Sequence, residues 1–143
     1  MTISVIVPCF NEEESIPLFH EAMEAIKYQI CDQFEYIFVN DGSTDRTLAV
    51  LRELSSRCPD VNYLSFSRNF GKEAALYAGL QEASGDLVTV MDVDLQDPPE
   101  LLIEMKAMLD SNPELDCVGT RRTTREGEPP IRSFFANLFY KLI

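Results

Sequence analysis

Two acidic residues separated by a single residue follow a strongly apolar stretch. Residues 87–91 are apolar or β-branched, which predicts a buried strand, and Asp92 and Asp94 come directly after it. Ligands of open α/β sheets bind at the carboxyl ends of the strands, so this pair is expected at that edge. Carboxylates so close together repel one another unless a cation lies between them. The pair therefore predicts a cation site.

A divalent metal ion is the simplest such cation. Mg²⁺ and Mn²⁺ prefer oxygen ligands and commonly combine one or two carboxylates with the phosphates of a substrate. Gln96, two residues beyond the pair, offers a neutral oxygen. A plain strand-to-helix turn is the alternative, and we adopt it for Asp97, which is placed to cap a helix starting at Pro98 and Pro99. One helix cap does not account for two further acids. The Asp-x-Asp motif alone is weakly specific, however, so other motifs are needed to choose between a metal site and a plain turn.

Three earlier strands are predicted to bring polar residues to the same edge. β-Branched and aromatic residues dominate 3–7, 34–39 and 61–66, and each run leads into a polar loop and then into apolar residues with helical spacing. Asn11 followed by Glu14 predicts a capping box for the first helix. The four strand ends thus present Asn11 with Glu12, Asp41, Arg68 with Lys72, and Asp92 with Asp94. Such an acidic pocket with a small cationic component suits a nucleotide diphosphate held through a metal.

The alternation of strands and helices predicts an α/β fold with three layers, in which helices flank both faces of a mainly parallel sheet. The strand at 87–91 is expected in the centre of that sheet. A helix after Pro99 is expected to stop before Pro113, and 117–119 is predicted as a fifth strand leading to Arg121. A chain of 143 residues is long enough for one hydrophobic core and too short for two.

Charge and cysteine content disfavour several classes of protein. The net charge is −12, whereas general nucleic-acid binding needs a basic surface, so no nucleic-acid partner is expected. Residues 1–110 have 20 acids and 7 bases, and residues 111–143 have 4 acids and 5 bases, so the last part suits an anion better. The four cysteines form no Cys-x-x-Cys pair, which disfavours zinc and thioredoxin-type sites and fits a reduced, cytosolic chain. We find no signal peptide and no apolar run of roughly 18 residues.

Motifs of several other enzyme classes are missing from the sequence. It has neither a Walker phosphate loop nor Gly-x-Gly-x-x-Gly, which disfavours an NTPase or a dinucleotide oxidoreductase. His20 is the only histidine and falls within the first predicted helix, so Ser–His or Cys–His catalysis is disfavoured.

Four stretches together, at 8–13, 40–45, 67–72 and 92–100, resemble the family-two inverting glycosyltransferases. Within that family the sequence is most similar to the polyprenyl-phosphate glycosyltransferases, the group of dolichol-phosphate mannose synthases and undecaprenyl-phosphate sugar transferases. The resemblance implies a Rossmann-like GT-A fold, a nucleotide-sugar donor, Mg²⁺ or Mn²⁺ as cofactor, and a polyprenyl-phosphate acceptor. The form of 94–100, Asp-Leu-Gln-Asp-Pro-Pro-Glu, favours a UDP-sugar over a GDP-sugar.

The resemblance also implies roles for individual residues. Asp94 and Arg121 are expected to take part in catalysis. The residues expected to bind the donor are Pro8, Phe10, Asn11, Glu12, Val39, Asp41, Arg68, Lys72, Asp92 and Val93. Those expected around the metal and diphosphate are Asp92, Asp94 and Gln96. Arg121 resembles an arginine that meets the acceptor phosphate, and Arg132 is a second candidate for that role.

Members of this family continue beyond the last residue of this chain, so we expect a C-terminal truncation. We divide the chain into a nucleotide-sugar-binding GT-A catalytic domain, 1–130, and the start of an acceptor and membrane-proximal region, 131–143. The spacing in 131–143 predicts an amphipathic helix, which is typical of core packing and also of a membrane interface. The full-length protein is expected at the cytoplasmic face of the membrane, which it contacts through the missing part, and the truncated chain is expected to be soluble. Homo-oligomer formation stays open.

Two other enzyme classes use similar acids. A sugar-phosphate nucleotidyltransferase needs a basic, glycine-rich loop near its N-terminus, whereas 8–13 is acidic. A haloacid-dehalogenase phosphatase carries its nucleophile on the first strand and needs further acids downstream, and only 43 residues, 101–143, follow Glu100. A module that binds a nucleotide-sugar without transferring it is the third alternative.

Overall fold

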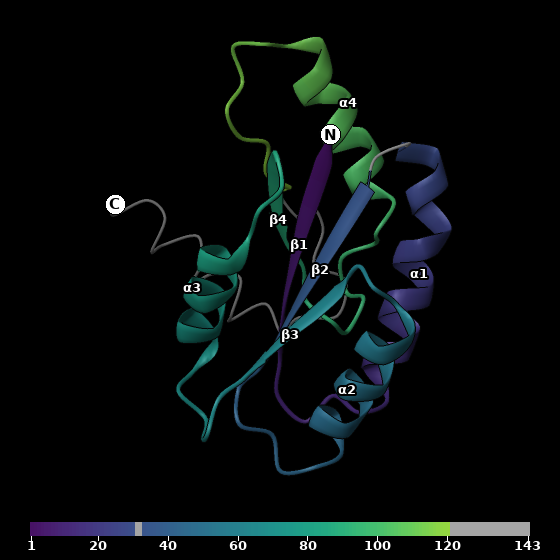
Figure 1. The fold of residues 1–143 in the computed structure, drawn as a ribbon. Coiled ribbons are helices and arrows are strands. Elements are labelled where there is room, and N and C mark those ends of the chain that lie inside the picture. The colour runs from purple at the N-terminus through teal and green to yellow at the C-terminus, as the bar shows by residue number, and fades with distance from the viewer. Residues whose placement is uncertain (31–32, 121–143) are drawn as a thin grey trace, which may run out of the picture.

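The computed structural model describes residues 1–30 and 33–120 (Figure 1). Its strands are β1 (Thr2–Cys9), β2 (Gln33–Asn40), β3 (Val61–Ser65) and β4 (Leu87–Val90). Its helices are α1 (Ser15–Ile30), α2 (Thr47–Arg57), α3 (Lys72–Glu82) and α4 (Leu101–Ser111). The strands form one sheet in the order β3-β2-β1-β4, and every neighbouring pair is parallel. The predicted parallel α/β sheet is confirmed.

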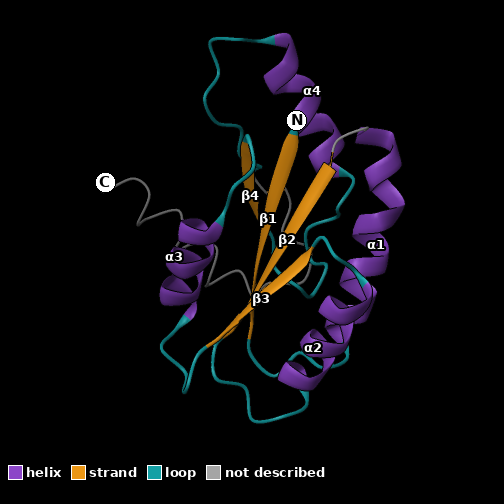
Figure 2. Cartoon of the chain, in the orientation of Figure 1, coloured by secondary structure: helices purple, strands orange, loops and turns teal. Residues whose placement is uncertain are grey.

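Helices cover both faces of the sheet, as Figure 2 shows, with α3 on one side and α1, α2 and α4 on the other. The alternation of side chains along β2 explains the two apolar layers, because successive residues of a strand point to opposite faces. Phe34, Tyr36 and Phe38 belong to the larger core, which α1, α2 and α4 complete. Ile37 and Val39 pack with Ala75 of α3 in the smaller one. The three-layer prediction is thereby confirmed.

Small residues bring α3 unusually close to the sheet. A Cβ added to Gly79 would lie 2.4 Å from Cγ2 of Ile6 and 3.3 Å from Cγ2 of Val39, and the first distance is too short for any real contact. Ala75, one turn earlier, is fully buried. This close approach fixes the start of α3, and with it Lys72, above the carboxyl ends of β1 and β2.

The predicted central position of the strand at 87–91 is wrong. β4 ends at Val90 and pairs only with β1 among the strands of the described chain, so it is an edge strand there. Its register with β1 puts Val90 beside Ile6, on the face that α3 covers. However, α3 packs on β1 and β2, and therefore Val88 and Val90 remain 47% and 44% exposed. An apolar run identifies a strand but does not determine its neighbours.

Two further predictions about chain elements are also wrong. Residues 117–119 form no strand, and Cys117 and Gly119 are exposed instead of paired in a sheet. The last helix begins at Leu101 after Glu100, which makes no side-chain cap, and not at Pro98 and Pro99 as expected. The helix start is reached through a turn instead, in which the carbonyls of Pro98 and Pro99 accept bonds from the N–H groups of Leu101 and Leu102. No helix in the described ranges is long and apolar enough to cross a membrane.

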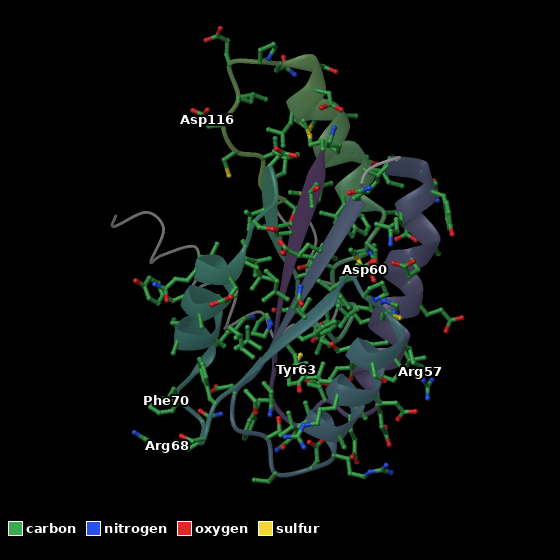
Figure 3. The ribbon with its side chains drawn as sticks, viewed as in Figure 1. Arg57, Asp60, Tyr63, Arg68, Phe70 and Asp116 are labelled. Atoms are coloured by element: carbon green, nitrogen blue, oxygen red, sulfur yellow. The ribbon has the colours of Figure 1, made fainter. Side chains whose placement is uncertain are left out.

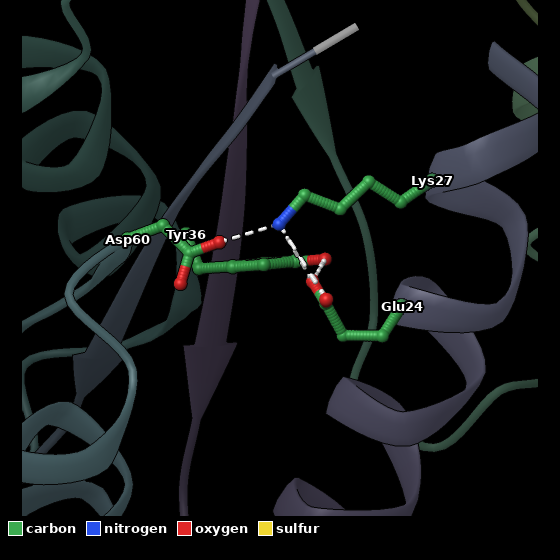
Figure 4. A network of polar contacts seen from close by, with 4 residues as sticks. All are labelled: Glu24, Lys27, Tyr36 and Asp60. Atoms are coloured by element: carbon green, nitrogen blue, oxygen red, sulfur yellow. Dashed lines mark hydrogen bonds and ion pairs between the residues drawn. The ribbon is translucent and has the colours of Figure 1, made fainter. Parts of the chain in front are cut away.

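A polar network holds α1 to the sheet at its amino edge (Figure 4). Lys27 Nζ lies 2.6 Å from Asp60 Oδ2 and 3.1 Å from Glu24 Oε1, and the Tyr36 hydroxyl donates to the same Glu24 oxygen at 3.0 Å. Burial and the nearby Glu24 carboxylate raise the pKa of Tyr36. His20 packs edge-on against the Tyr36 ring, with its Nε2 atom buried and without a hydrogen-bond partner. This network lies at the end of the sheet opposite the strand ends that carry the acidic pair.

Candidate active site

A cleft of about 460 Å³ lies at the carboxyl edge of the sheet. Its volume falls within the range of small-molecule sites, roughly 300–1,000 Å³. The lining residues come from the ends of β1, β2 and β4 and from the start of α3. This is the edge of the sheet at which the sequence predicted the site. They are Pro8, Cys9, Phe10, Glu12, Asp41, Asn69, Gly71, Lys72, Ala75, Asp92, Val93 and Asp94.

The apolar part of the cleft is formed by the end of β1 and by α3. Phe10 is 46% exposed and lines the cleft, so an aromatic side chain is accessible there to a planar ligand. Cys9 is buried beside it, and its thiol donates to the Val7 carbonyl. Burial, with a smaller effect of the Glu12 carboxylate, raises the pKa of the Cys9 thiol. The thiol therefore stays protonated and acts as packing, not as a nucleophile.

Asp41 joins the loop after β2 to the loop that precedes α3. The residue is 4% exposed, and its two carboxylate oxygens accept bonds from the backbone N–H groups of Phe70 at 2.7 Å and Gly71 at 2.9 Å. The two loops touch at Gly42, where an added Cβ would lie 2.2 Å from the carbonyl carbon of Arg68. Gly42 also has a φ of +66°, which favours glycine. Asp41 is therefore a fixed strut under the cleft wall.

A second set of bonds fixes the loop after β1. Asn11 has a φ of +56°, and its Oδ1 accepts a bond from the Thr44 N–H at 2.8 Å, while its own N–H donates to Ser43 Oγ. The predicted capping box is wrong, because α1 begins only at Ser15 and the Asn11 oxygen is used by the neighbouring loop. Glu12 donates its backbone N–H to Thr47 Oγ1 at 2.8 Å. The β1 and β2 loops thus form one rigid rim.

Asp45 adds to this rim from the start of α2. It accepts bonds from the Glu13 N–H at 3.3 Å and the Thr47 N–H at 2.9 Å. Desolvation alone would raise the pKa of Asp45, but the bonds from Thr47 and Glu13 outweigh it and hold the pKa below its ordinary value. Asp45 therefore supports the rim as an ionised carboxylate.

The acidic pair lies at the open side of the cleft. Asp92 forms an ion pair with Lys72, whose Nζ lies 2.6 Å from Asp92 Oδ1. Asp94 Oδ1 accepts a hydrogen bond from the Gln96 N–H at 3.1 Å. Leu95, between Asp94 and Gln96, has a φ of +57°, a left-handed conformation that is strained for a bulky residue. The turn therefore holds both carboxylates at the end of β4.

These residues fit Mg²⁺ or Mn²⁺ only as a shared site. Within 1–30 and 33–120, no group of three or more histidine, cysteine or acidic side chains could hold a metal ion. Two carboxylates are the usual protein share when substrate phosphates supply further oxygen ligands. The Lys72 ammonium on Asp92 shows that a cation already fits against this carboxylate. The donor set thus suits a metal that binds together with a diphosphate.

The cleft contains most of the residues that the sequence placed in the site. Those brought together are Pro8, Phe10, Glu12, Asp41, Lys72, Asp92, Val93 and Asp94. Asn11, Val39, Arg68 and Gln96 are absent from the lining, and Val39 is fully buried beneath it. Arg68 lies with its guanidinium carbon 4.3 Å from the centre of the Phe70 ring, and Figure 3 shows the two side chains at the tip of the loop before α3. Arg121 and Arg132 lie outside the described residues.

Four lining residues were missed by the sequence analysis: Cys9, Asn69, Gly71 and Ala75. Gly71 carried the clearest signal, because a glycine directly before a predicted helix permits the φ of +99° that it adopts. Ala75 follows it by one helical turn, and a small residue there leaves room for a ligand. Cys9 and Asn69 gave no chemical signal of their own.

Comparison with known proteins places this site in a family. Residues 4–142 match the family described as Glycosyl transferase family 2. The chain is 42% identical over 142 residues to the bactoprenol glucosyl transferase of Shigella phage SfV, covering 99% of this chain and 46% of that protein. It is 41% identical over 141 residues to the putative glycosyltransferase CsbB of Bacillus subtilis (strain 168), covering 99% of this chain and 42% of that protein. The chain thus spans less than half the length of these relatives.

Solved structures agree with the sequence match. The mannosyltransferase PcManGT from Pyrobaculum calidifontis, in complex with GDP-Man and Mn²⁺, superposes with a TM-score of 0.67 at 27% identity and covers 82% of this chain and 35% of that chain. Glucosyl-3-phosphoglycerate synthase from Mycobacterium tuberculosis, in complex with UDP, gives a TM-score of 0.60 at 26% identity over 78% of this chain and 40% of that chain. Over almost its whole length, this chain therefore belongs to glycosyl transferase family 2, and it has the GT-A fold.

Proposed function

We propose that the protein containing this domain transfers a sugar from a nucleotide-sugar, with inversion, to the phosphate of a polyprenyl lipid. The observation that carries the proposal is the cleft itself, in which an acidic pair, a lysine and an exposed aromatic ring meet at the carboxyl edge of a parallel sheet. The name of the Shigella phage relative, bactoprenol glucosyl transferase, supports the lipid acceptor and a glucosyl donor.

The nucleoside of the donor would lie along the wall formed by Pro8, Phe10, Glu12 and Asp41. Phe10 supplies a stacking face, and the Glu12 carboxylate can accept bonds from a base N–H or a ribose hydroxyl. Asp41 already accepts two backbone bonds, and carboxylate oxygens have further lone pairs for a ligand. We favour UDP as the nucleotide, which agrees with the UDP bound in the Mycobacterium tuberculosis synthase.

The diphosphate would lie between Lys72 and the acidic pair. Lys72 would donate to a phosphate oxygen, while Asp92 and Asp94, with Gln96 nearby in the sequence, would hold Mg²⁺ or Mn²⁺. The Mn²⁺ in the PcManGT complex supports this assignment. The cation, when bound, neutralises negative charge that develops on the leaving nucleoside diphosphate. Asp94 serves catalysis by keeping the diphosphate oriented for departure.

The acceptor needs no general base. A phosphate group is largely ionised near neutral pH, with a second pKa of about 6 in phosphorylated side chains. One of its oxygens attacks the anomeric carbon from the face opposite the diphosphate, the bond from that carbon to the diphosphate oxygen breaks, and its electron pair leaves with the nucleotide. Arg121 and Arg132 are proposed to orient the acceptor phosphate through charge-assisted bonds.

For the 143-residue chain by itself, donor binding without transfer is the second candidate. The observation that favours it is the coverage of the relatives, which is 46% for the phage enzyme and 42% for CsbB. The residues that would complete an acceptor site can lie in the remainder of such proteins.

Calorimetric titration of the chain with UDP-glucose and GDP-mannose, with Mn²⁺ or with EDTA, tests donor binding. We expect UDP-glucose to bind with Mn²⁺ and its affinity to fall by at least about tenfold in EDTA, a difference of roughly 1.4 kcal/mol. Asp94→Asn should abolish the metal dependence, whereas Asp110→Asn, on the exposed face of α4, should leave it unchanged. Equal affinity in Mn²⁺ and EDTA would refute the metal-dependent donor site.

A further inference from the structure

Lys72 and Asp92 cannot keep their present contact and also fulfil the roles proposed for them. The lysine ammonium lies 2.6 Å from Asp92 Oδ1, and both residues line the cleft. The proposed function assigns Asp92 to the metal and Lys72 to the diphosphate. Binding of the donor complex therefore has to break this ion pair and give each partner a new one.

The fold holds the backbone that carries Lys72. Lys72 is the first residue of α3, directly after Gly71, whose N–H is bonded to the buried Asp41 carboxylate at 2.9 Å. Gly71 also accepts the first bond of the helix, from the Ala75 N–H at 3.2 Å. The backbone at Lys72 is therefore fixed. Its four-carbon side chain, which is 54% exposed, is free to turn.

The charge balance of the cleft gives the pair its function. Among the lining residues, four are acidic, namely Glu12, Asp41, Asp92 and Asp94, and Lys72 is the only cation that the described chain contributes. Without a ligand, the ammonium relieves the repulsion around Asp92. A metal ion that binds alone must displace the Lys72 ammonium from Asp92. A diphosphate that binds alone is repelled by the acidic residues of the lining.

We propose that Lys72 is an exchangeable counter-ion, which occupies Asp92 in the free protein and moves to the donor's diphosphate when the metal ion takes Asp92. This inference rests on the proposed function and adds a rule for how its two ligands bind. Each ligand removes the obstacle to the other, because the metal releases Lys72 and the diphosphate receives it. Metal and nucleotide therefore bind with positive coupling, and the coupling is reciprocal.

Removal of the lysine separates this mechanism from simple phosphate binding. If Lys72 only bound phosphate, Lys72→Met would weaken nucleotide binding and leave the affinity for a free metal ion unchanged. If Lys72 occupies Asp92, the same variant binds metal more tightly when no nucleotide is present. The expected gain is roughly two- to fivefold, which is the range that an exposed ion pair spans.

The experiment measures Mn²⁺ affinity by the electron paramagnetic resonance signal of free Mn²⁺, with and without UDP. The proteins are the wild-type chain, Lys72→Met, Lys72→Arg and Arg57→Met. Arg57 is a matched control, because it also loses one positive charge but lies in the last turn of α2, where it pairs with Glu53 and is 69% exposed. Circular dichroism verifies that each variant is folded.

We expect Lys72→Met to bind Mn²⁺ about two- to fivefold more tightly than wild type without UDP, and UDP to enhance its Mn²⁺ affinity less. Lys72→Arg, which keeps the charge, and Arg57→Met should resemble wild type. Unchanged or weaker Mn²⁺ binding by folded Lys72→Met, in a wild type that binds Mn²⁺ with UDP, would overturn the exchange alone. A wild type that binds no Mn²⁺ even with UDP would overturn the proposed metal site and the exchange with it.

Discussion

Asparagine in place of Asp41 isolates the strut that holds the cleft wall. Asp41 is 4% exposed, and its carboxylate gives one oxygen to each of two backbone N–H groups, those of Phe70 and Gly71. Asparagine has the same shape but only one oxygen, and its NH₂ group would face the second N–H. One buried donor then loses its acceptor, which costs about 1–3 kcal/mol. We therefore expect Asp41→Asn to lower the free energy of unfolding by that amount.

Urea denaturation and amide hydrogen exchange measure the two consequences of this change. The amides of Phe70 and Gly71 should exchange on the order of tenfold faster, the equivalent of about 1.4 kcal/mol of local stability. Asp116→Asn is the control, because Asp116 is exposed in the segment after α4, and its loss should change stability by no more than about 0.5 kcal/mol. If Asp41→Asn is as stable as wild type and the two amides keep their protection, Asp41 is not a strut.

Three other predictions concern the core, the amino edge and the acceptor. Gly79→Ala should destabilise the fold by about 1–3 kcal/mol in urea denaturation, because its Cβ would lie 2.4 Å from Cγ2 of Ile6; an unchanged midpoint would contradict this contact. Burial, opposed by attraction to Glu24 and Asp60, lowers the pKa of His20 below 6.5, so the unfolded chain takes up a proton first and stability should fall as the pH drops below about 6.5. His20→Gln should remove that part of the pH dependence, and an identical slope in both proteins would refute it. In the full-length enzyme, Arg121→Ala should lower transfer to polyprenyl phosphate sharply and leave nucleotide affinity within a few-fold; near-wild-type transfer would indicate a surface ion pair worth about 0–1 kcal/mol.

Local patterns predicted the elements and the edge at which the site lies. The runs that became β1, β2 and β3, and the polar residues after each, required only the periodicity of side chains and the rule that parallel strands end at one edge. Eight of the predicted site residues line the cleft for this reason, from Pro8 to Asp94.

Contacts between distant loops could not be predicted from local patterns. Asp41 was predicted only as a ligand-binding residue at a strand end, whereas its hydrogen-bond partners are backbone groups 29 and 30 residues away. Asn11 had the spacing of a cap, but the loop 33 residues further along uses its oxygen. The edge position of β4 also depends on which strands pair and on how far α3 extends over the sheet. The amino-acid composition of β4 indicates neither of these.

The match to glycosyl transferase family 2 decides between the enzyme classes that the acids alone left open. It disfavours both the sugar-phosphate nucleotidyltransferase and the haloacid-dehalogenase phosphatase, since the family covers 4–142 and includes all four motifs. The predicted GT-A fold is confirmed. The division at residue 130, the roles of Arg121 and Arg132, and the identity of the acceptor stay proposals.

Sugar transfer by the full-length protein tests the central proposal most directly. Labelled UDP-glucose is incubated with polyprenyl phosphate and Mn²⁺, and the labelled lipid product is quantified for wild type and for Asp94→Asn. We predict transfer by wild type that stops in EDTA, and a loss of at least about a hundredfold, roughly 2.7 kcal/mol of transition-state stabilisation, in a folded Asp94→Asn enzyme. Transfer that continues undiminished in EDTA or in Asp94→Asn would contradict the account of this cleft.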